Sequence, residues 1–226
     1  MQNLTRENQS YNDRLQRAKS WLQKAKTISE IQGEEVDHNP LFIFLWIALS
    51  ALYSREKSDS PSDPNDFTDF LVRLYKLDHQ RRLRTTLLSA KARANMLLRD
   101  KFLCDVYWKE GTSPRVLELL VKDNHRAEAA WTKGDLVPYL QLLFRRLGLL
   151  GNQIFHGCST DRRSLNRNSI VPAVGLLQAL IPTLVLIFEQ CGQHEKWPSV
   201  AYPRRGSPLI PDCELWINWY TPKASS

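Results

Sequence analysis

Apolar residues recur every three or four positions through most of the chain, which is the spacing of amphipathic helices. In the first stretch these positions are Leu4, Tyr11, Leu15, Ala18, Leu22 and Ala25. The spacing predicts a helix over residues 4–31. It should end near Gly33, since glycine favours a helix terminus and the residue before Pro40 is pushed out of the helical region. A strongly apolar helix is expected next, over residues 40–54.

The remaining pattern is also helical, with turn-rich loops between the segments. Helices are predicted over residues 65–77, through the basic stretch 79–100, from 135 to 155 and from 165 to 190. Asp135 is the expected N-cap of the helix predicted from 135 to 155. Its inward positions are Leu136, Leu140, Leu143, Phe144 and Leu147. Pro172 and Pro182 are expected to kink the last helix.

These elements predict an all-α fold with a simple domain organisation. No alternation typical of strands and no internal repeat interrupts the helical pattern. We expect a single helical domain over residues 1–195, with residues 1–33 as its N-terminal helix. A non-helical extension rich in proline and aromatic residues, 196–226, should pack on this bundle as a strap or short strand.

Composition adds constraints on location and partners. The 226 residues carry a net charge of +7, which favours an anionic partner without specifying one. The four cysteines are far apart, with no spacing typical of zinc ligands, so we expect reduced thiols and no metal or other cofactor. The polar N-terminus lacks the apolar core of a secretory signal, and a cytoplasmic protein is expected.

An uncharged segment, residues 170–188, raises the alternative of a membrane helix. It contains Pro172, Gln178, Pro182 and Thr183, and the other apolar segment, 40–53, is shorter. We therefore interpret it as a helix buried on all sides in a protein core. Association with a membrane remains a third, less favoured interpretation.

The candidate chemistry lies near the end of the helix predicted over residues 135–155, in the stretch "GNQIFHG". The chain has no phosphate-binding glycine loop, GxSxG or HExxH motif. Asn152 and His156 are four residues apart, so they should share one helical face. An amide and an imidazole placed in this way can act on one substrate atom. Alternatively, His156 caps helix carbonyls and Asn152 bonds a neighbouring helix.

The same stretch resembles the motif of HEPN-type proteins, in which an arginine precedes a sequence like "NQ..HG". Asn152, Gln153, His156 and Gly157 match that motif, and the "NR" of Asn166 and Arg167 is similar to the start of the family's final helix. With "FLWIALSALYS" and "KWPSVAYP", the resemblance covers roughly residues 40–205. Gly151 stands where the family has its arginine.

The resemblance implies an up-and-down bundle that often dimerises and cleaves RNA without a metal. His156 would be the acid or base and Asn152 would orient the phosphate. Residues 141–170 carry five arginines against Asp161, a local charge of 5 − 1 = +4. The proposed RNA-binding arginines are Arg145, Arg146, Arg162, Arg163 and Arg167.

The sequence therefore predicts a HEPN-like RNA-binding protein. It would be a metal-independent RNase, or a degenerate one, of a defence or toxin–antitoxin system, with an antitoxin protein as a further partner. The alternative, favoured by Gly151, is a non-catalytic dimeric helical module that binds nucleic acid or a partner protein.

Overall fold

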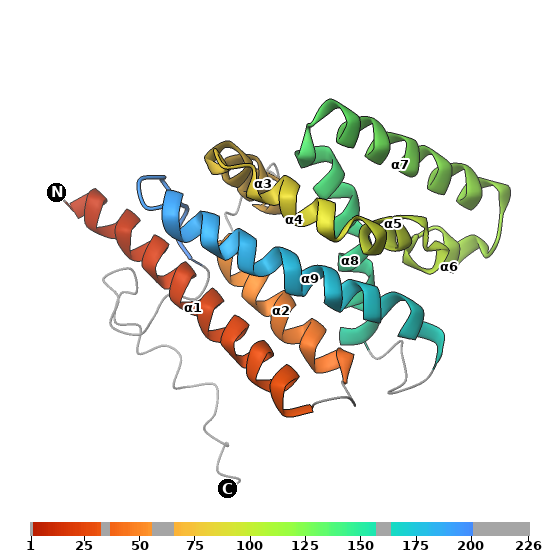
Figure 1. Ribbon diagram of the computed structural model, residues 1–226, viewed down its shortest axis with the longest axis horizontal. Helices are drawn as coiled ribbons and strands as arrows, with labels where there is room; N and C mark the ends of the chain where they lie inside the picture. The colour runs from red at the N-terminus through yellow and green to blue at the C-terminus, as the bar shows by residue number, and fades with distance from the viewer. Residues whose placement is uncertain (1, 33–36, 56–65, 157–163, 201–226) are drawn as a thin grey trace, which may run out of the picture.

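The computed structural model describes residues 2–32, 37–55, 66–156 and 164–200, and the described chain is all-α (Figure 1). The first part contains three helices of different length, α1 (Gln2–Gln32), α2 (His38–Tyr53) and α3 (Asp66–Leu77). Shorter elements follow, namely α4 (Arg82–Ser89), α5 (Lys91–Arg99), the 3-10 turn η1 (Lys101–Leu103) and α6 (Tyr107–Glu110). The last part contains α7 (Pro114–Lys133), α8 (Leu136–Phe155) and α9 (Ser164–Cys191). Within these residues the only extended pairing is an isolated antiparallel bridge between Arg55 and Val200.

Helix α9 is the centre of the fold. It contacts α1, α2, α3, α4, α5 and α8, and it lies beside α1 and α2 in Figure 1. It runs as one helix through Pro172 and Pro182. The stretch Asn168–Cys191 is long and apolar enough to cross a membrane, but 61% of its most apolar window is buried inside the protein. The segment is therefore buried in large part, but not on all sides as predicted, because Val171, Gln178, Pro182 and Leu186 are exposed along one side of the helix.

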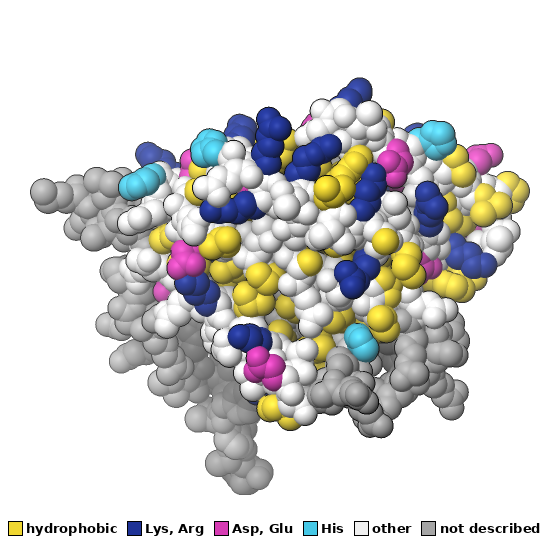
Figure 2. All heavy atoms as spheres, viewed as in Figure 1, with side chains coloured by type: hydrophobic (Ala, Val, Ile, Leu, Met, Phe, Trp, Pro, Cys, Tyr) yellow, Lys and Arg dark blue, Asp and Glu magenta, His cyan; other side chains and the backbone are white. Residues whose placement is uncertain are grey.

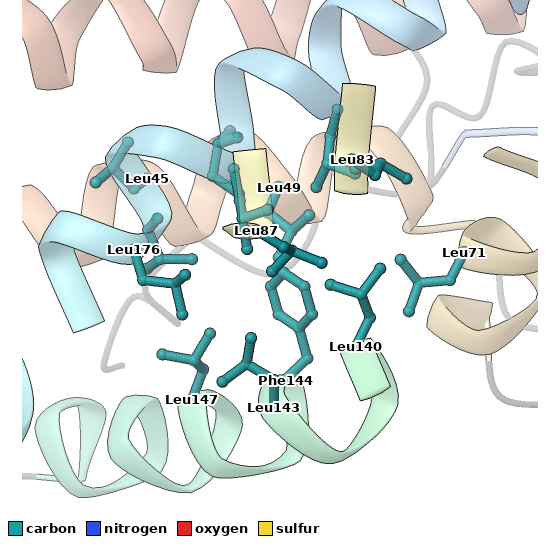
Figure 3. Close-up of a cluster of buried hydrophobic side chains, with 14 of the residues drawn as sticks. Leu45, Leu49, Leu71, Leu83, Leu87, Leu140, Leu143, Phe144, Leu147 and Leu176 are labelled. Atoms are coloured by element: carbon teal, nitrogen blue, oxygen red, sulfur yellow. The ribbon is translucent and has the colours of Figure 1, made fainter. Parts of the chain in front are cut away.

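Leucines from five helices form the core between α9 and α8 (Figure 3). The side chains that converge there come from α2 (Leu45, Leu49), α3 (Leu71), α4 (Leu83, Leu87), α8 (Leu140, Leu143, Phe144, Leu147) and α9 (Leu176). Each is at most 4% exposed. Burying a leucine side chain stabilises a fold by about 1.5–3 kcal/mol. This core fixes the rotation of α8, and so decides which of its residues face outward.

The residues that follow α9 fold back onto α1. Trp197 is buried, and its indole Nε1 donates to the carbonyl of Gly192 at 2.8 Å. The carbonyl of Pro198 accepts from Ser10 Oγ at 2.6 Å and from Arg14 Nη2 at 2.9 Å. Within the described residues, Trp197 and Pro198 of the predicted C-terminal extension therefore contact the bundle. Residues 201–226 of that extension lie outside the described part.

Two helix predictions need correction. The basic stretch 79–100 was expected to continue as one helix, but it divides at Ala90 into α4 and α5. Ala90 is 1% exposed, and its backbone φ of −103° and ψ of 8° turn the chain there. Helix α7 was not predicted at all, although Ser113 caps it and Pro114 occupies its first turn. The break at Ala90 does not follow from local propensity, and we attribute it to the packing of α4 and α5 against α9. Helix α7 does carry local signals at both ends, since Gly134 is its left-handed C-cap.

Candidate functional site

Helix α8 begins and ends where the sequence predicts. Asp135 is its N-cap and accepts a hydrogen bond from the Val137 amide at 3.3 Å. His156 is its C-cap residue, and the His156 amide donates to the Asn152 carbonyl at 3.0 Å. The helix therefore continues through the "NQIF" segment, and its last turn carries both Asn152 and His156.

Asn152 and His156 are both exposed at this end of α8. One helical turn separates them, a rise of about 6 Å. Phe155, between them in sequence, is 50% exposed. Arg145 is seven residues before Asn152, so it also lies on this face, about two turns away. The predicted shared face of the amide and the imidazole is thus present, with an arginine on the same side.

A cavity of about 390 Å³ lies along this face of α8. Arg145, Gly148, Gly151 and Asn152 line it from α8, whereas Trp46 of α2 and Asp105 line it from the facing elements. A neighbouring cavity of about 440 Å³ shares Trp46, Arg145 and Gly148 with the first. The two form one groove, which we call the α8 groove, and Asn152 and Phe155 line its end.

The two arginines of α8 differ sharply in position. The Arg145 side chain is 57% exposed and pairs with Asp123 of α7. The Arg146 side chain is 2% exposed, and its Nη2 donates to the same Asp123 carboxylate at 2.9 Å. Arg146 Nη1 donates to the Leu103 carbonyl at 2.7 Å. Arg146 was predicted to bind substrate, but its guanidinium is buried and committed to the fold.

The net charge around the α8 groove is also smaller than the +4 counted along residues 141–170. Asp123, from a helix that was not predicted, lies against both arginines, and Asp105 lines the groove. Arg162 and Arg163 lie outside the described residues. Arg167 lies within α9, and its side chain lies outside the described part. Of the five predicted RNA-binding arginines, the structure places Arg145 and Arg146 in the lining of the groove, and of these two the Arg145 side chain is the exposed one. Arg126 of α7, which was not predicted, also lines the groove.

Gln153, the other amide of the motif, faces inward. It is 7% exposed, and its Nε2 donates to the Phe102 carbonyl at 3.0 Å. Together with the bond from Arg146 to Leu103, this attaches η1 to the last turns of α8. The inward-facing side chains of Arg146 and Gln153 thus fix η1 against α8 at the groove, whereas Asn152 and His156 lie on the exposed side of the helix.

Gly151 is buried where α8 ends beside the start of α2 (Figure 1). A Cβ atom there would meet Phe42 at 3.5 Å and Phe155 at 3.6 Å, which are ordinary van der Waals contacts. The backbone has no positive φ at this position. Neither packing nor conformation therefore requires glycine, and a longer side chain has the groove beside it.

Some residues of the site were missed by the sequence analysis. Trp46 and Asp105 carry no pattern that would have placed them there. Asp123 does have a signal, since it occupies the apolar stripe formed by Val116, Leu120, Ala127 and Ala130. An acidic residue in such a stripe indicates a buried partner of opposite charge.

The described residues offer no group of three histidine, cysteine, aspartate or glutamate side chains that could hold a metal ion. Cys104 and Cys191 are free thiols, whereas Cys158 and Cys213 lie outside the described part. Compared with family models, curated proteins and solved structures, the chain shows no significant match in any of the three. The resemblance to HEPN-type proteins thus remains a prediction from the residues of the motif.

Proposed function

We propose that the protein binds RNA along the α8 groove and that Asn152 and His156 act on the phosphodiester at its end. The observation that carries the proposal is the exposure of this amide and this imidazole, one turn apart, beside a groove that Arg145 lines. A guanidinium and an amide can both donate to phosphate oxygens. The aromatic ring of Trp46 in the groove offers a surface on which an unpaired base can stack.

In this proposal, cleavage needs no metal. His156 accepts the proton of the ribose 2′-hydroxyl, whose oxygen attacks the adjacent phosphorus. The bond to the 5′-oxygen breaks, a proton from the imidazolium or water goes to that oxygen, and a 2′,3′-cyclic phosphate forms. Asn152 donates its amide N–H to a non-bridging oxygen and orients the phosphate. In the HEPN-type motif an arginine would offset the negative charge that develops on the phosphate. This chain has Gly151 at that position, so we expect slow cleavage.

Further features of the proposal follow the HEPN-like resemblance. We propose an up-and-down HEPN-like bundle that acts as a homodimer in the cytoplasm, within a defence or toxin–antitoxin system. An antitoxin protein is then a candidate partner. The 50% exposure of Phe155 next to His156 is consistent with contact to a second copy at this end of α8.

A non-catalytic module is the second candidate, and Gly151 is the observation that favours it. Removing one donor to a transition-state oxygen costs on the order of 10²–10³ in rate. A chain that lacks this donor could keep its RNA affinity and lose cleavage. The two candidates share the groove as the RNA-binding surface and differ in whether His156 transfers a proton.

The test is incubation of purified protein with single-stranded RNA in excess EDTA. We expect slow cleavage with cyclic-phosphate ends, lost in His156→Ala and strongly reduced in Asn152→Ala. His125→Ala is the matched control, because His125 is an exposed histidine on α7. Cleavage by His156→Ala at the rate of the parent protein would refute the catalytic role.

Gly151→Arg separates the two candidate functions. A Cβ fits at this position without displacing a neighbour, so the variant should fold. If the rest of the site is intact, Gly151→Arg should raise the cleavage rate by about 10² or more, because it restores a donor whose removal costs about that factor. Tight RNA binding with no gain in cleavage would favour the non-catalytic module.

A further inference from the structure

A second concave site lies at the opposite end of α8 from Asn152. It is a cavity of about 580 Å³ between the end of α3, the start of α4, and the turn from α7 to α8. We call it the basic cavity, and its lining includes Asp78, His79, Arg81, Arg84, Lys133 and Gly134. Since α8 has 20 residues, about 30 Å separates its two ends. The basic cavity is therefore distinct from the groove end that carries His156.

Cations dominate the lining of the basic cavity. Arg81, Arg84 and Lys133 are set against the single carboxylate of Asp78. That carboxylate accepts from the Arg82 amide at 2.9 Å and from the Leu83 amide at 2.8 Å, so its oxygens face the start of α4. Figure 2 shows lysine and arginine side chains along the upper part of the face, over α4 and the neighbouring end of α7.

Two of these cations have no ion-pair partner among the residues that the structure describes. Within the described residues, the side chains of Arg81 and Lys133 form neither an ion pair nor a hydrogen bond. Asp135, the nearest acidic residue in sequence to Lys133, uses its carboxylate as the N-cap of α8. Uncompensated cations around a concave surface attract and hold anions.

Arg81 also has an unfavourable backbone conformation. Its φ of 54° and ψ of 31° lie in the left-handed region, and it is the only non-glycine residue with positive φ in the described part of the chain. Arginine has no side-chain feature that favours this region, whereas asparagine and glycine do. Strain of this kind occurs preferentially at binding sites. The Arg81 amide donates to the Asp78 carbonyl at 3.0 Å, which holds the strained turn.

Arg84 is fixed in place by Trp131. Its guanidinium carbon lies 4.9 Å from the centroid of the Trp131 ring, and its Nη1 donates to the Trp131 carbonyl at 3.4 Å. A guanidinium positioned in this way loses little further conformational entropy when it binds an anion. The cavity thus combines one preorganised arginine with two cations free to turn toward a ligand.

We propose that the basic cavity binds a phosphate-bearing anion. Arg81, Arg84 and Lys133 would donate to the phosphate oxygens, because guanidinium and ammonium groups form charge-assisted hydrogen bonds with phosphate. A volume of about 580 Å³ lies within the range of small-molecule sites and leaves room for the group that carries the phosphate. The phosphate could belong to a free small molecule or to a nucleic-acid backbone. The proposal does not depend on the function proposed for the α8 groove.

The test measures binding of inorganic pyrophosphate by isothermal titration calorimetry at low salt. We expect one saturable site per chain. Lys133→Gln should weaken it about tenfold, the loss expected for one charge-assisted hydrogen bond. Lys122→Gln, an exposed lysine on the same helix, is the matched control and should bind like the parent protein.

Arg81→Asn adds a readout that a purely structural role would not give. Asparagine tolerates the left-handed conformation, so the melting temperature should rise while pyrophosphate affinity falls about tenfold. No saturable binding, or equal affinity in all variants, would overturn the proposal. A parallel titration with a short single-stranded RNA identifies the source of the phosphate. Weaker RNA binding by Lys133→Gln points to a nucleic-acid backbone, and unchanged RNA binding points to a free phosphorylated ligand.

Discussion

Substitution of Asp123 by alanine should destabilise the protein strongly, because Asp123 balances a buried charge. The Arg146 side chain is 2% exposed and the Asp123 side chain 9%, so both groups are shielded from water. Removal of the carboxylate leaves the Arg146 guanidinium buried with the Leu103 carbonyl as its remaining partner among the described residues. Breaking a buried ion pair from one side costs about 3–5 kcal/mol.

The exposed partner adds little to this loss. The Arg145 side chain is 57% exposed, and an ion pair open to solvent contributes about 0–1 kcal/mol. Arg145→Ala is therefore the matched control, expected to lower the free energy of unfolding by less than 1 kcal/mol. The combination Asp123→Leu with Arg146→Met removes both buried charges, and should recover most of the stability, since apolar replacements of buried ion pairs are often neutral.

Urea denaturation followed by circular dichroism measures these differences. A loss of 3–5 kcal/mol is a large part of the 5–15 kcal/mol typical of folded domains, so the midpoint for Asp123→Ala should fall markedly. A loss below about 1 kcal/mol would refute the reasoning, because it would mean that the Arg146 charge is not shielded from water. Equal losses for Asp123→Ala and Arg145→Ala would contradict the assignment of the effect to Arg146.

Two further substitutions test the core. Burial, with a smaller contribution from the Glu128 charge, raises the pKa of Tyr139 from 10.0 to about 12, and its hydroxyl has no hydrogen-bond partner among the described residues. The folded state therefore holds this proton more tightly than the unfolded state, and stability should fall between about pH 10 and pH 12. Tyr139→Phe should reduce that fall and raise the unfolding free energy at pH 7 by about 1 kcal/mol, and a steeper alkaline loss would contradict it. A Cβ at Gly192 would lie 2.5 Å from the Phe188 carbonyl oxygen, which is too close for the backbone to stay in place. Gly192→Ala should therefore lower the free energy of unfolding, measured by urea denaturation, by about 1–3 kcal/mol. An unchanged free energy of unfolding would contradict this, because it would mean that the turn adapts.

Much of α8 could be predicted from the sequence because its signals are local. Asp135 is a capping residue, and Leu136, Leu140, Leu143, Phe144 and Leu147 are spaced for one helical face. All five are buried, and the helix ends at Phe155 as expected. The exposed positions of Asn152 and His156 follow from the same periodicity, because they lie opposite the core face.

The break at Ala90 and the presence of α7 were not predicted. Ala90 favours helix, and neither proline nor glycine is adjacent to it, so the packed surroundings of α4 and α5 determine the turn. In α7, Asp123 interrupts an otherwise apolar stripe and weakens the amphipathic signal. Only a structure shows that this carboxylate meets Arg146 across the helix interface.

The charge of the site could not be predicted for the same reason. A count along the sequence treats Arg145 and Arg146 as equivalent neighbours, but adjacent helical residues point about 100° apart. Arg146 therefore turns into the protein while Arg145 remains outside. The acidic residues that offset them, Asp123 and Asp105, come from other segments.

The central claim is that RNA binds along the α8 groove, and equilibrium binding of fluorescein-labelled single-stranded RNA tests it most directly. Arg145→Gln and Asn152→Ala should each weaken binding by about tenfold or more. Arg145→Gln should also reduce the salt dependence of binding by about one phosphate contact. Lys122→Gln should bind like the parent protein. Unchanged affinity and salt dependence in both groove variants would contradict the account.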